Sequence, residues 1–193
     1  MRICFATNNK NKLREIKSKL GEAYDIISLS DLGHTEELSE THDTLEENSL
    51  EKAQFIHEKY QINCFADDTG LLVEALNGEP GVNSARYAGP GKSSDDNMQL
   101  LLDKLKGQKH RNAKFITVIT LMLDGNAHQF SGEIDGVISR EQSGSKGFGY
   151  DPIFIPNGWQ KTFAEVDLKE KNKISHRSIA VEKLVEFLSK VKS

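Results

Sequence analysis

The middle of the chain carries the pattern that most constrains the fold. Residues 113–123 and 127–138 form two long runs of alternating character, and Asp124-Gly125-Asn126 separates them. Alternation with a period of two is typical of strands with one buried face, and an Asp-Gly pair between such runs favours a tight turn. The sequence therefore predicts a long antiparallel hairpin, and the fold must contain a β-sheet.

Strands and helices alternate through the rest of the chain. Short apolar segments predict strands at residues 2–7, 24–29 and 62–66. Apolar residues at helical spacing predict helices at a segment with Leu13, Ile16 and Leu20 and at residues 43–60, 94–105 and 175–190, with Ser94 as the cap of the third. Together with the hairpin, this order predicts an α/β or α+β fold with a mixed sheet. Without a repeat or a long linker, residues 1–193 are expected to form a single domain with a cleft.

Composition excludes several classes of function. A formal net charge of -4 leaves no large basic surface for a nucleic-acid polymer, although a few cations placed together would suffice for a small polyanion. No apolar run approaches the roughly 20 residues that span a bilayer, so no membrane partner is expected. The N-terminal residues turn polar too soon for a signal peptide, which predicts a cytoplasmic protein.

Cys4 and Cys64 belong to no CxxC pair or Cys/His cluster and are expected to be buried free thiols.

The segment Thr7-Asn8-Asn9-Lys10-Asn11-Lys12 lies where a predicted strand gives way to a predicted helix. A helix N-terminus offers backbone N–H groups to an anion, and the side chains here add donors and positive charge. The segment is therefore a candidate phosphate-binding turn. A helix start with asparagine caps accounts for the same residues.

Asp67 and Asp68 follow an apolar strand and precede Thr69-Gly70. Mg²⁺ in proteins is typically held by one or two carboxylates together with water and phosphate oxygens. Adjacent carboxylates also repel, so one of the pair is a candidate to accept a proton from a metal-bound water. A simple turn is the competing interpretation, because the residues of Asp-Asp-Thr-Gly are common in turns.

Acidic residues are dense between Glu36 and Glu51. Most are expected to form a solvated loop and helix face, and one of them is a candidate to complete a metal site. Lys52 lies one helical turn after Asn48, so the two side chains are expected to face the same side.

The segment Gly147-Phe148-Gly149-Tyr150-Asp151-Pro152 combines glycines, an aromatic ring and an acid. Flanking glycines let a backbone approach a ligand closely, and stacking of Phe148 on a base would contribute about 1–3 kcal/mol. Asp151 could read the edge of a base. A plain loop that leads into a strand is the alternative.

The last predicted helix begins with Ser175-His176-Arg177. Ser175 is a good cap, whereas a cation in the first turn is disfavoured by the helix dipole, which predicts an anionic or electron-rich partner for this end. The histidines show no HxxxH or HExxH pair, so zinc is not expected.

Six segments, taken in order along nearly the whole chain, resemble the inosine/xanthosine triphosphate pyrophosphatase family. They are Thr7-x-Asn9-x-x-Lys12, Glu47-Asn48-x-x-x-Lys52-Ala53, Ala66-Asp67-Asp68-Thr69-Gly70-Leu71, Pro80-Gly81-x-x-Ser84-Ala85-Arg86-Tyr87, Gly147-Phe148-Gly149-Tyr150-Asp151-Pro152 and Lys171-Asn172-x-x-Ser175-His176-Arg177. The resemblance implies an α/β fold of two lobes around a long mixed sheet, with a central substrate cleft, in a homodimer.

The resemblance also implies a role for each matched position. Asp68 would be the proton acceptor and a Mg²⁺ ligand. Phosphates would contact residues 7–12 (Thr7, Asn8, Asn9, Lys10, Asn11 and Lys12), Lys52 and Lys171, and the substrate would also contact Thr69. The base and sugar would contact Phe148, Gly149, Tyr150, Asp151, His176 and Arg177. One departure concerns the second metal ligand: some relatives have a glutamate where Ser39 aligns, so the adjacent Glu40 is the candidate here, and His42 replaces a usual glycine.

The implied reaction is hydrolysis of ITP, dITP and XTP to the monophosphate and pyrophosphate, with Mg²⁺ bridging Asp68 and the triphosphate. A water oriented by Asp68 or Asp67 would attack the α-phosphorus, while Lys12, Lys52 and Lys171 offset charge on the leaving group. Arg177 can only donate hydrogen bonds, which suits a 6-oxo purine better than a 6-amino one. A nucleotide-binding module without hydrolysis and a phosphatase that releases single phosphates are the alternatives.

Overall fold

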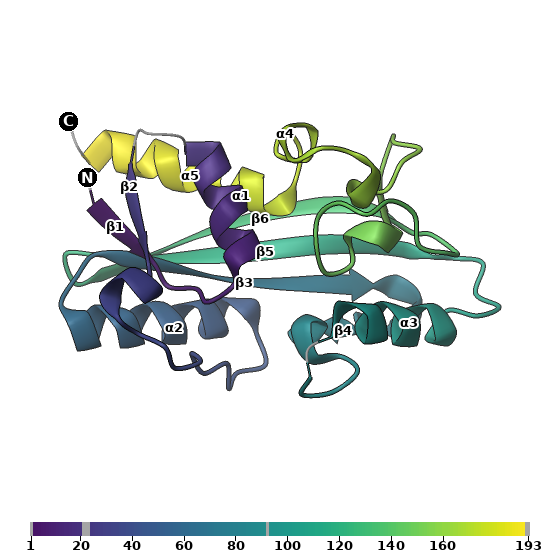
Figure 1. The fold of residues 1–193 in the computed structure, drawn as a ribbon, viewed down its shortest axis with the longest axis horizontal. Coiled ribbons are helices and arrows are strands. Elements are labelled where there is room, and N and C mark those ends of the chain that lie inside the picture. Colours follow the sequence, from purple (N-terminus) through teal and green to yellow (C-terminus); the bar gives the residue numbers. More distant parts are fainter. Residues whose placement is uncertain (1, 21–23, 92, 192–193) are drawn as a thin grey trace. The chain divides into compact units, whose positions relative to one another are not determined.

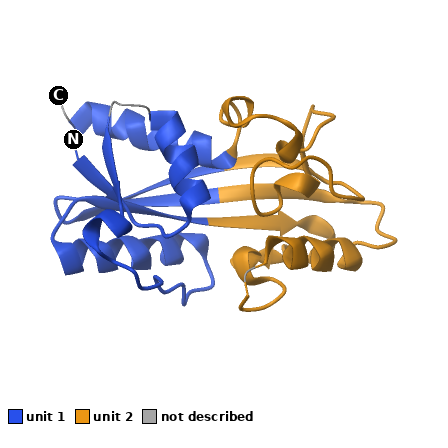
Figure 2. Ribbon diagram, in the orientation of Figure 1, with its two compact units in different colours: residues 1–68, 117–132, 176–193 blue, residues 69–116, 133–175 orange. Residues whose placement is uncertain are grey.

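The computed structural model describes residues 2–20, 24–91 and 93–191. The chain divides into two compact units, which Figure 2 shows in different colours: unit 1 is Met1–Asp68, Thr117–Gly132 and His176–Ser193, and unit 2 is Thr69–Ile116 and Glu133–Ser175. Strands β3 (Cys64–Val73), β5 (Asn112–Leu123) and β6 (Asn126–Ile138) each contribute residues to both units.

The strands form a mixed sheet, as predicted. Its order is β2 (Asp25–Ser28), β1 (Arg2–Phe5), β3, β5, β6 and β7 (Phe154–Pro156), and β4 (Pro80–Gly81) also pairs with β3. Strand β1 is parallel to both β2 and β3, whereas β3 and β4 are antiparallel, as are β6 and β7. The mixed sheet and the helices that alternate with its strands confirm the α/β fold class.

The predicted hairpin is the pair β5 and β6, which are neighbours in the sheet. Between them, Asp124 has φ 49° and Gly125 has φ 82°. Positive φ at both central residues is the mark of the two-residue turn whose twist matches that of the flanking strands. The turn prediction is confirmed, with Asn126 as the first residue of β6.

In unit 1, helices α1 (Lys10–Leu20) and α5 (His176–Val191) lie on one face of the sheet and α2 (Leu45–Tyr60) lies on the other (Figure 1). Alternate residues of a strand point to opposite faces. Accordingly, Phe5 of β1 and Phe65 of β3 pack in the core with α1 and α5. Cys4 and Cys64, which are paired in register, pack in the core under α2 and are buried free thiols as predicted.

In unit 2, helix α3 (Ser94–Lys104) packs its Met98 and Leu101 on a core that includes Phe115 and Phe154. The prediction that Ser94 caps this helix is wrong, because the side chain of Ser93 accepts the hydrogen bond from the backbone N–H of Asp96. The short helix α4 (Leu168–Lys171) follows later in the same unit. Single 3₁₀ turns cover Ser30–Leu32, Glu74–Leu76, Ser84–Arg86, Asp151–Ile153 and Phe163–Glu165.

Strand β3 differs most from the sequence prediction, which ended it at Ala66 and allowed a turn at residues 67–70. The strand continues without interruption to Val73, so Asp67 and Asp68 lie in its middle. Strand β1 pairs with β3 at Cys64 and Phe65, β4 pairs with it at Leu71 and Leu72, and β5 is its other neighbour in the sheet. Cations neutralise the two acids that lie between these pairings, so the strand accommodates them. Among the described helices, none is long and apolar enough to cross a membrane.

Candidate active site

Asp67 is the centre of a buried charge cluster on the α1 and α5 side of unit 1. One carboxylate oxygen accepts a hydrogen bond from Nζ of Lys12 at 3.0 Å, and the other accepts one from Nε of Arg177 at 3.2 Å. Burial alone would raise the pKa of Asp67, but the charges of Lys12, Arg177 and Lys52 hold that pKa far below its ordinary value. Asp67 is therefore ionised at neutral pH and binds two cations.

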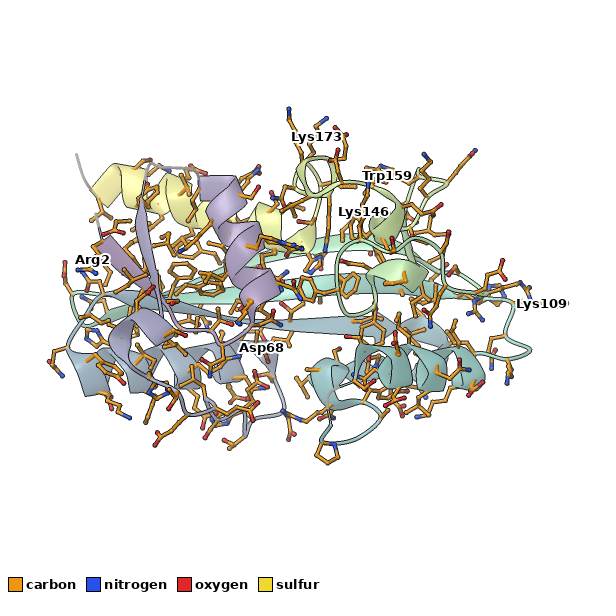
Figure 3. All side chains as sticks on the ribbon, viewed as in Figure 1. Arg2, Asp68, Lys109, Lys146, Trp159 and Lys173 are labelled. Carbon is orange, nitrogen blue, oxygen red and sulfur yellow. The ribbon has the colours of Figure 1, made fainter. Side chains whose placement is uncertain are left out.

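Asp68, the next residue, lies on the α2 side of the sheet (Figure 3). Its Oδ1 is 3.6 Å from Nζ of Lys52. Burial raises the pKa of Asp68, opposed by Lys52 and supported by the negative charges of Glu40 and Asp67. The two adjacent acids thus have pKa values that move in opposite directions, and Asp68 is the stronger base.

Lys52 is buried on α2 and contacts three groups of unit 1. Its Nζ donates to Oε1 of Glu40 at 2.6 Å and to the backbone oxygen of Asp67 at 2.8 Å, in addition to its contact with Asp68. Burial would lower the pKa of Lys52, but Asp68 and Glu40 raise it. The ammonium group therefore stays charged between two carboxylates.

The loop that carries Glu40 is fastened to α2 by side chains of that helix. Asn48 accepts a hydrogen bond from the backbone N–H of His42 and donates one to the backbone oxygen of the same residue. Glu51 accepts bonds from the backbone N–H and the hydroxyl of Thr41. These contacts hold Glu40 toward Lys52. Asn48 and Lys52 contact the same loop, so they face the same side as predicted.

The other acids of this region behave as the sequence predicted. Most are exposed, namely Glu36, Glu37, Asp43, Glu46 and Glu47. Ser39, the position that aligns with a metal-binding glutamate of some relatives, is also exposed. Glu40 is the acid of the loop that reaches the Lys52 cluster.

The segment 7–12 has the asparagine cap that the sequence allowed. Oδ1 of Asn9 accepts hydrogen bonds from the backbone N–H groups of Asn11 and Lys12, at 2.9 and 3.1 Å. Asn8 donates to the backbone oxygen of Glu36 at 2.8 Å. Asn8, Asn9 and Lys10 are exposed, so the turn that begins α1 is accessible to a ligand even though its first N–H groups are capped.

Arg177 and His176 are both buried in the first turn of α5. The anionic partner predicted for this end of the helix is supplied by the protein itself: besides Asp67, Nη1 of Arg177 donates to Oε2 of Glu15. Two carboxylates offset the unfavourable helix dipole and the loss of hydration of the guanidinium group.

Glu15 is a residue that the sequence reasoning missed. It lies on α1, one helical turn after Lys12 and beside the buried Ile16, and is 4% exposed. No local signal in the sequence marks it, because Glu15 lies off the stripe of Leu13, Ile16 and Leu20 that marks the apolar face of α1.

In unit 2, Asp151 organises the glycine-containing segment. Its Oδ2 accepts a hydrogen bond from the backbone N–H of Phe148 at 2.9 Å and one from Nζ of Lys171 at 2.6 Å. Lys171 also lies 5.0 Å from the ring centre of Phe148 and 5.3 Å from that of Phe163. Asp151 and Lys171 are thus a buried ion pair next to the half-buried ring of Phe148.

Gly147 is required by this arrangement. Its φ is +72°, and a Cβ at this position would lie 2.1 Å from Oδ2 of Asp151. Gly149 also has a positive φ of +62°, but a Cβ there would meet no atom within 4 Å. Tyr150 is buried and donates to the backbone oxygen of Ser84, so it anchors the segment, while Thr69 is half-buried at the unit 2 side of β3.

The carboxylates of Glu40 and Asp68 in unit 1 could supply two of the oxygen ligands of a divalent cation. Among the described residues, no group of three His, Cys, Asp or Glu side chains could hold a metal ion. Glu40 and Asp68, however, both contact the ammonium group of Lys52, so they already share one cation. Two carboxylates suit Mg²⁺ when water and phosphate oxygens complete its octahedron.

Known proteins match this chain over nearly its whole length. The Ham1 family model matches residues 3–187. The chain is 52% identical to the dITP/XTP pyrophosphatase of Christiangramia forsetii over 98% of this chain and 100% of that protein. It is 42% identical to the dITP/XTP pyrophosphatase of Bacillus subtilis over 95% of each chain.

Solved structures agree. The Staphylococcus aureus Ham1 protein superposes with a TM-score of 0.88 at 39% identity, over 98% of each chain. A Ham1 protein from Coxiella burnetii gives a TM-score of 0.89 at 36% identity, over 98% of this chain and 99% of that one. On its sequence and its fold, this chain belongs to the Ham1 family.

Proposed function

We propose that this protein is a pyrophosphatase that hydrolyses dITP, ITP and XTP to the corresponding monophosphate and pyrophosphate, which keeps these bases out of DNA and RNA. The names of the relatives give the substrate class. The observation that carries the chemistry is the contrast between Asp67 and Asp68, because one acid fixes cations while its neighbour is a base of raised pKa. Hydrolysis of a phosphoanhydride needs both functions.

In the proposed reaction, Asp68 accepts a proton from the water that attacks the α-phosphorus. Asp67 is too weak a base for this step, since its cations hold its pKa far below the ordinary value. Lys12, held by Asp67, and Lys52 offset the charge that develops on the departing pyrophosphate. Glu40 and Asp68 would hold Mg²⁺, which supplies positive charge to the triphosphate.

For the base, the proposal retains the residues that the family resemblance implies. In unit 2, the ring of Phe148 rests on the Asp151–Lys171 pair and offers a stacking surface for a purine. In unit 1, Arg177 can only donate hydrogen bonds, and a donor favours the 6-oxo group of hypoxanthine or xanthine over the 6-amino group of adenine. Because this side chain is buried and donates to Asp67 and Glu15, the proposed contact requires Arg177 to rearrange when the nucleotide binds.

The proposal also includes a cytoplasmic location and a homodimer, both of which the family resemblance implies. Sedimentation velocity of the purified chain tests the dimer: a single species with the mass of one chain contradicts it. Fractionation of the source cells tests the location.

One assay tests the proposed activity. The protein is incubated with MgCl₂ and, separately, ITP, dITP, XTP, ATP and GTP, and the products are resolved by ion-exchange chromatography. Pyrophosphate and IMP should appear together from ITP, with little turnover of ATP. Intact ITP would contradict hydrolysis and leave the nucleotide-binding module as the alternative, and IDP with inorganic phosphate would show a stepwise phosphatase. A parallel incubation with EDTA tests the metal requirement.

A further inference from the structure

Lys52 lies where a metal cation would be expected in unit 1. Its Nζ is 2.6 Å from Oε1 of Glu40 and 3.6 Å from Oδ1 of Asp68, and its side chain is 6% exposed. An ammonium group loses most of its hydration in such a position, so it is held there by the carboxylates. The two candidate metal ligands therefore already have a cation that belongs to the protein.

The contacts around Lys52 keep it in this place. Its Nζ also donates to the backbone oxygen of Asp67 at 2.8 Å, on the strand that carries Asp68. On the other side, Asn48 binds the backbone of His42 through both atoms of its amide group, which holds the loop of Glu40 against the helix that carries Lys52. The ammonium group of Lys52, on α2, thus contacts both strand β3 and the loop of Glu40.

We propose, on the basis of the function proposed above, that Lys52 is a built-in cation that keeps divalent metal from binding to the nucleotide-free protein. Mg²⁺ would then enter together with the triphosphate. The oxygens of the triphosphate would attract Lys52 away from Glu40 and Asp68 and would supply further ligands to the metal. Two observations favour this order. A metal ion that approaches alone meets the positive charge of Lys52, and among the described residues no group of three His, Cys, Asp or Glu side chains could hold a metal ion.

Calorimetric titration of MgCl₂ into nucleotide-free protein tests the proposal directly. Lys52→Met removes the charge and should bind Mg²⁺ about tenfold more tightly than the wild type, or better, because repulsion between charges a few ångströms apart is lost. Lys52→Arg keeps the charge and should bind as weakly as the wild type. Lys59→Met, which removes an exposed lysine of the same helix, is the matched control and should also resemble the wild type.

The proposal is overturned if the wild type binds Mg²⁺ as tightly as Lys52→Met does, or if Lys52→Arg gains as much affinity as Lys52→Met. Thermal unfolding gives a second readout: MgCl₂ should raise the melting temperature of Lys52→Met more than that of the wild type, and equal shifts contradict the proposal. If Lys52→Met does not fold, Lys52→Gln, which keeps a hydrogen-bond donor, takes its place in both measurements.

These titrations contain no nucleotide, so their outcome is independent of catalysis. A wild type that releases pyrophosphate from ITP while Lys52→Met gains no Mg²⁺ affinity disproves the built-in cation alone. A wild type that leaves ITP intact disproves the proposed function instead.

Discussion

Asp67 and Asp68 are consecutive residues of β3, yet they take their cations from opposite faces of the sheet. Asp67 binds Lys12 of α1 and Arg177 of α5, whereas Asp68 faces Lys52 of α2. Successive side chains of a strand point in opposite directions, so a continuous strand separates two acids that a turn would have left side by side. This separation gives the two carboxylates opposite pKa shifts.

Replacement of Asp67 should mainly reduce stability. Asp67→Asn leaves the half-buried Lys12 and the buried Arg177 beside a neutral amide, and removing one partner of a buried ion pair costs about 3–5 kcal/mol. Urea unfolding at pH 7 measures this loss. A decrease below about 1 kcal/mol, the size of a surface ion pair, would contradict the buried network.

The stability difference between the wild type and Asp67→Asn should depend on pH. The folded state lowers the pKa of Asp67, so its contribution to stability is complete above the unfolded pKa of about 3.9 and is lost as the pH falls toward the lower folded pKa. The difference in unfolding free energy between the wild type and Asp67→Asn should therefore shrink below about pH 4. A constant difference from pH 7 to pH 2.5 would show that Asp67 does not act through its charge.

Replacement of Asp68 should reduce activity rather than stability. Asp68→Asn removes the proton acceptor and should lower kcat for ITP by about 10²–10⁴-fold. Its melting temperature should equal or exceed that of the wild type, because burial disfavours the charged form of this acid. Pyrophosphate release and thermal unfolding are measured together, with Asp135→Asn, an exposed acid of β6, as the control. Unchanged pyrophosphate release by Asp68→Asn would show that another group accepts the proton.

The glycines on either side of Phe148 should differ in their tolerance of a methyl group. Gly147→Ala places Cβ against the Asp151 carboxylate and should cost more than the roughly 1–2 kcal/mol of left-handed strain that Gly149→Ala also carries. Comparison of the two variants by urea unfolding isolates the clash. Equal losses would mean that the Asp151–Lys171 pair moves without cost.

Cys4 and Cys64 should be unreactive in the folded protein. Burial raises the pKa of each thiol to about 12, and both side chains are fully covered. Because the thiolate is the reactive form, reaction with Ellman's reagent at pH 8 should be slow in buffer and rapid in urea. Rapid labelling without denaturant would contradict this packing.

The sequence by itself determined the features that depend on neighbouring residues. Asp124-Gly125 set the hairpin because its backbone adopts the required positive φ without help from elsewhere. Apolar periodicity located the helices, since each helix must bury one face. The six ordered segments indicated the family, which the match over residues 3–187 shows.

Only the tertiary structure decided how the charged groups are shared. Arg177 meets Asp67 across 110 residues of sequence and Glu15 across 162, and such distant pairs leave no local pattern to find. The sequence could present Asp67 and Asp68 as a pair and Glu40 as one acid among many. Burial and nearby charge set the pKa of a carboxylate. The faces of β3 and the helices packed against them therefore decide that Asp67 is a fixed anion, that Asp68 is a base and that Glu40 holds Lys52.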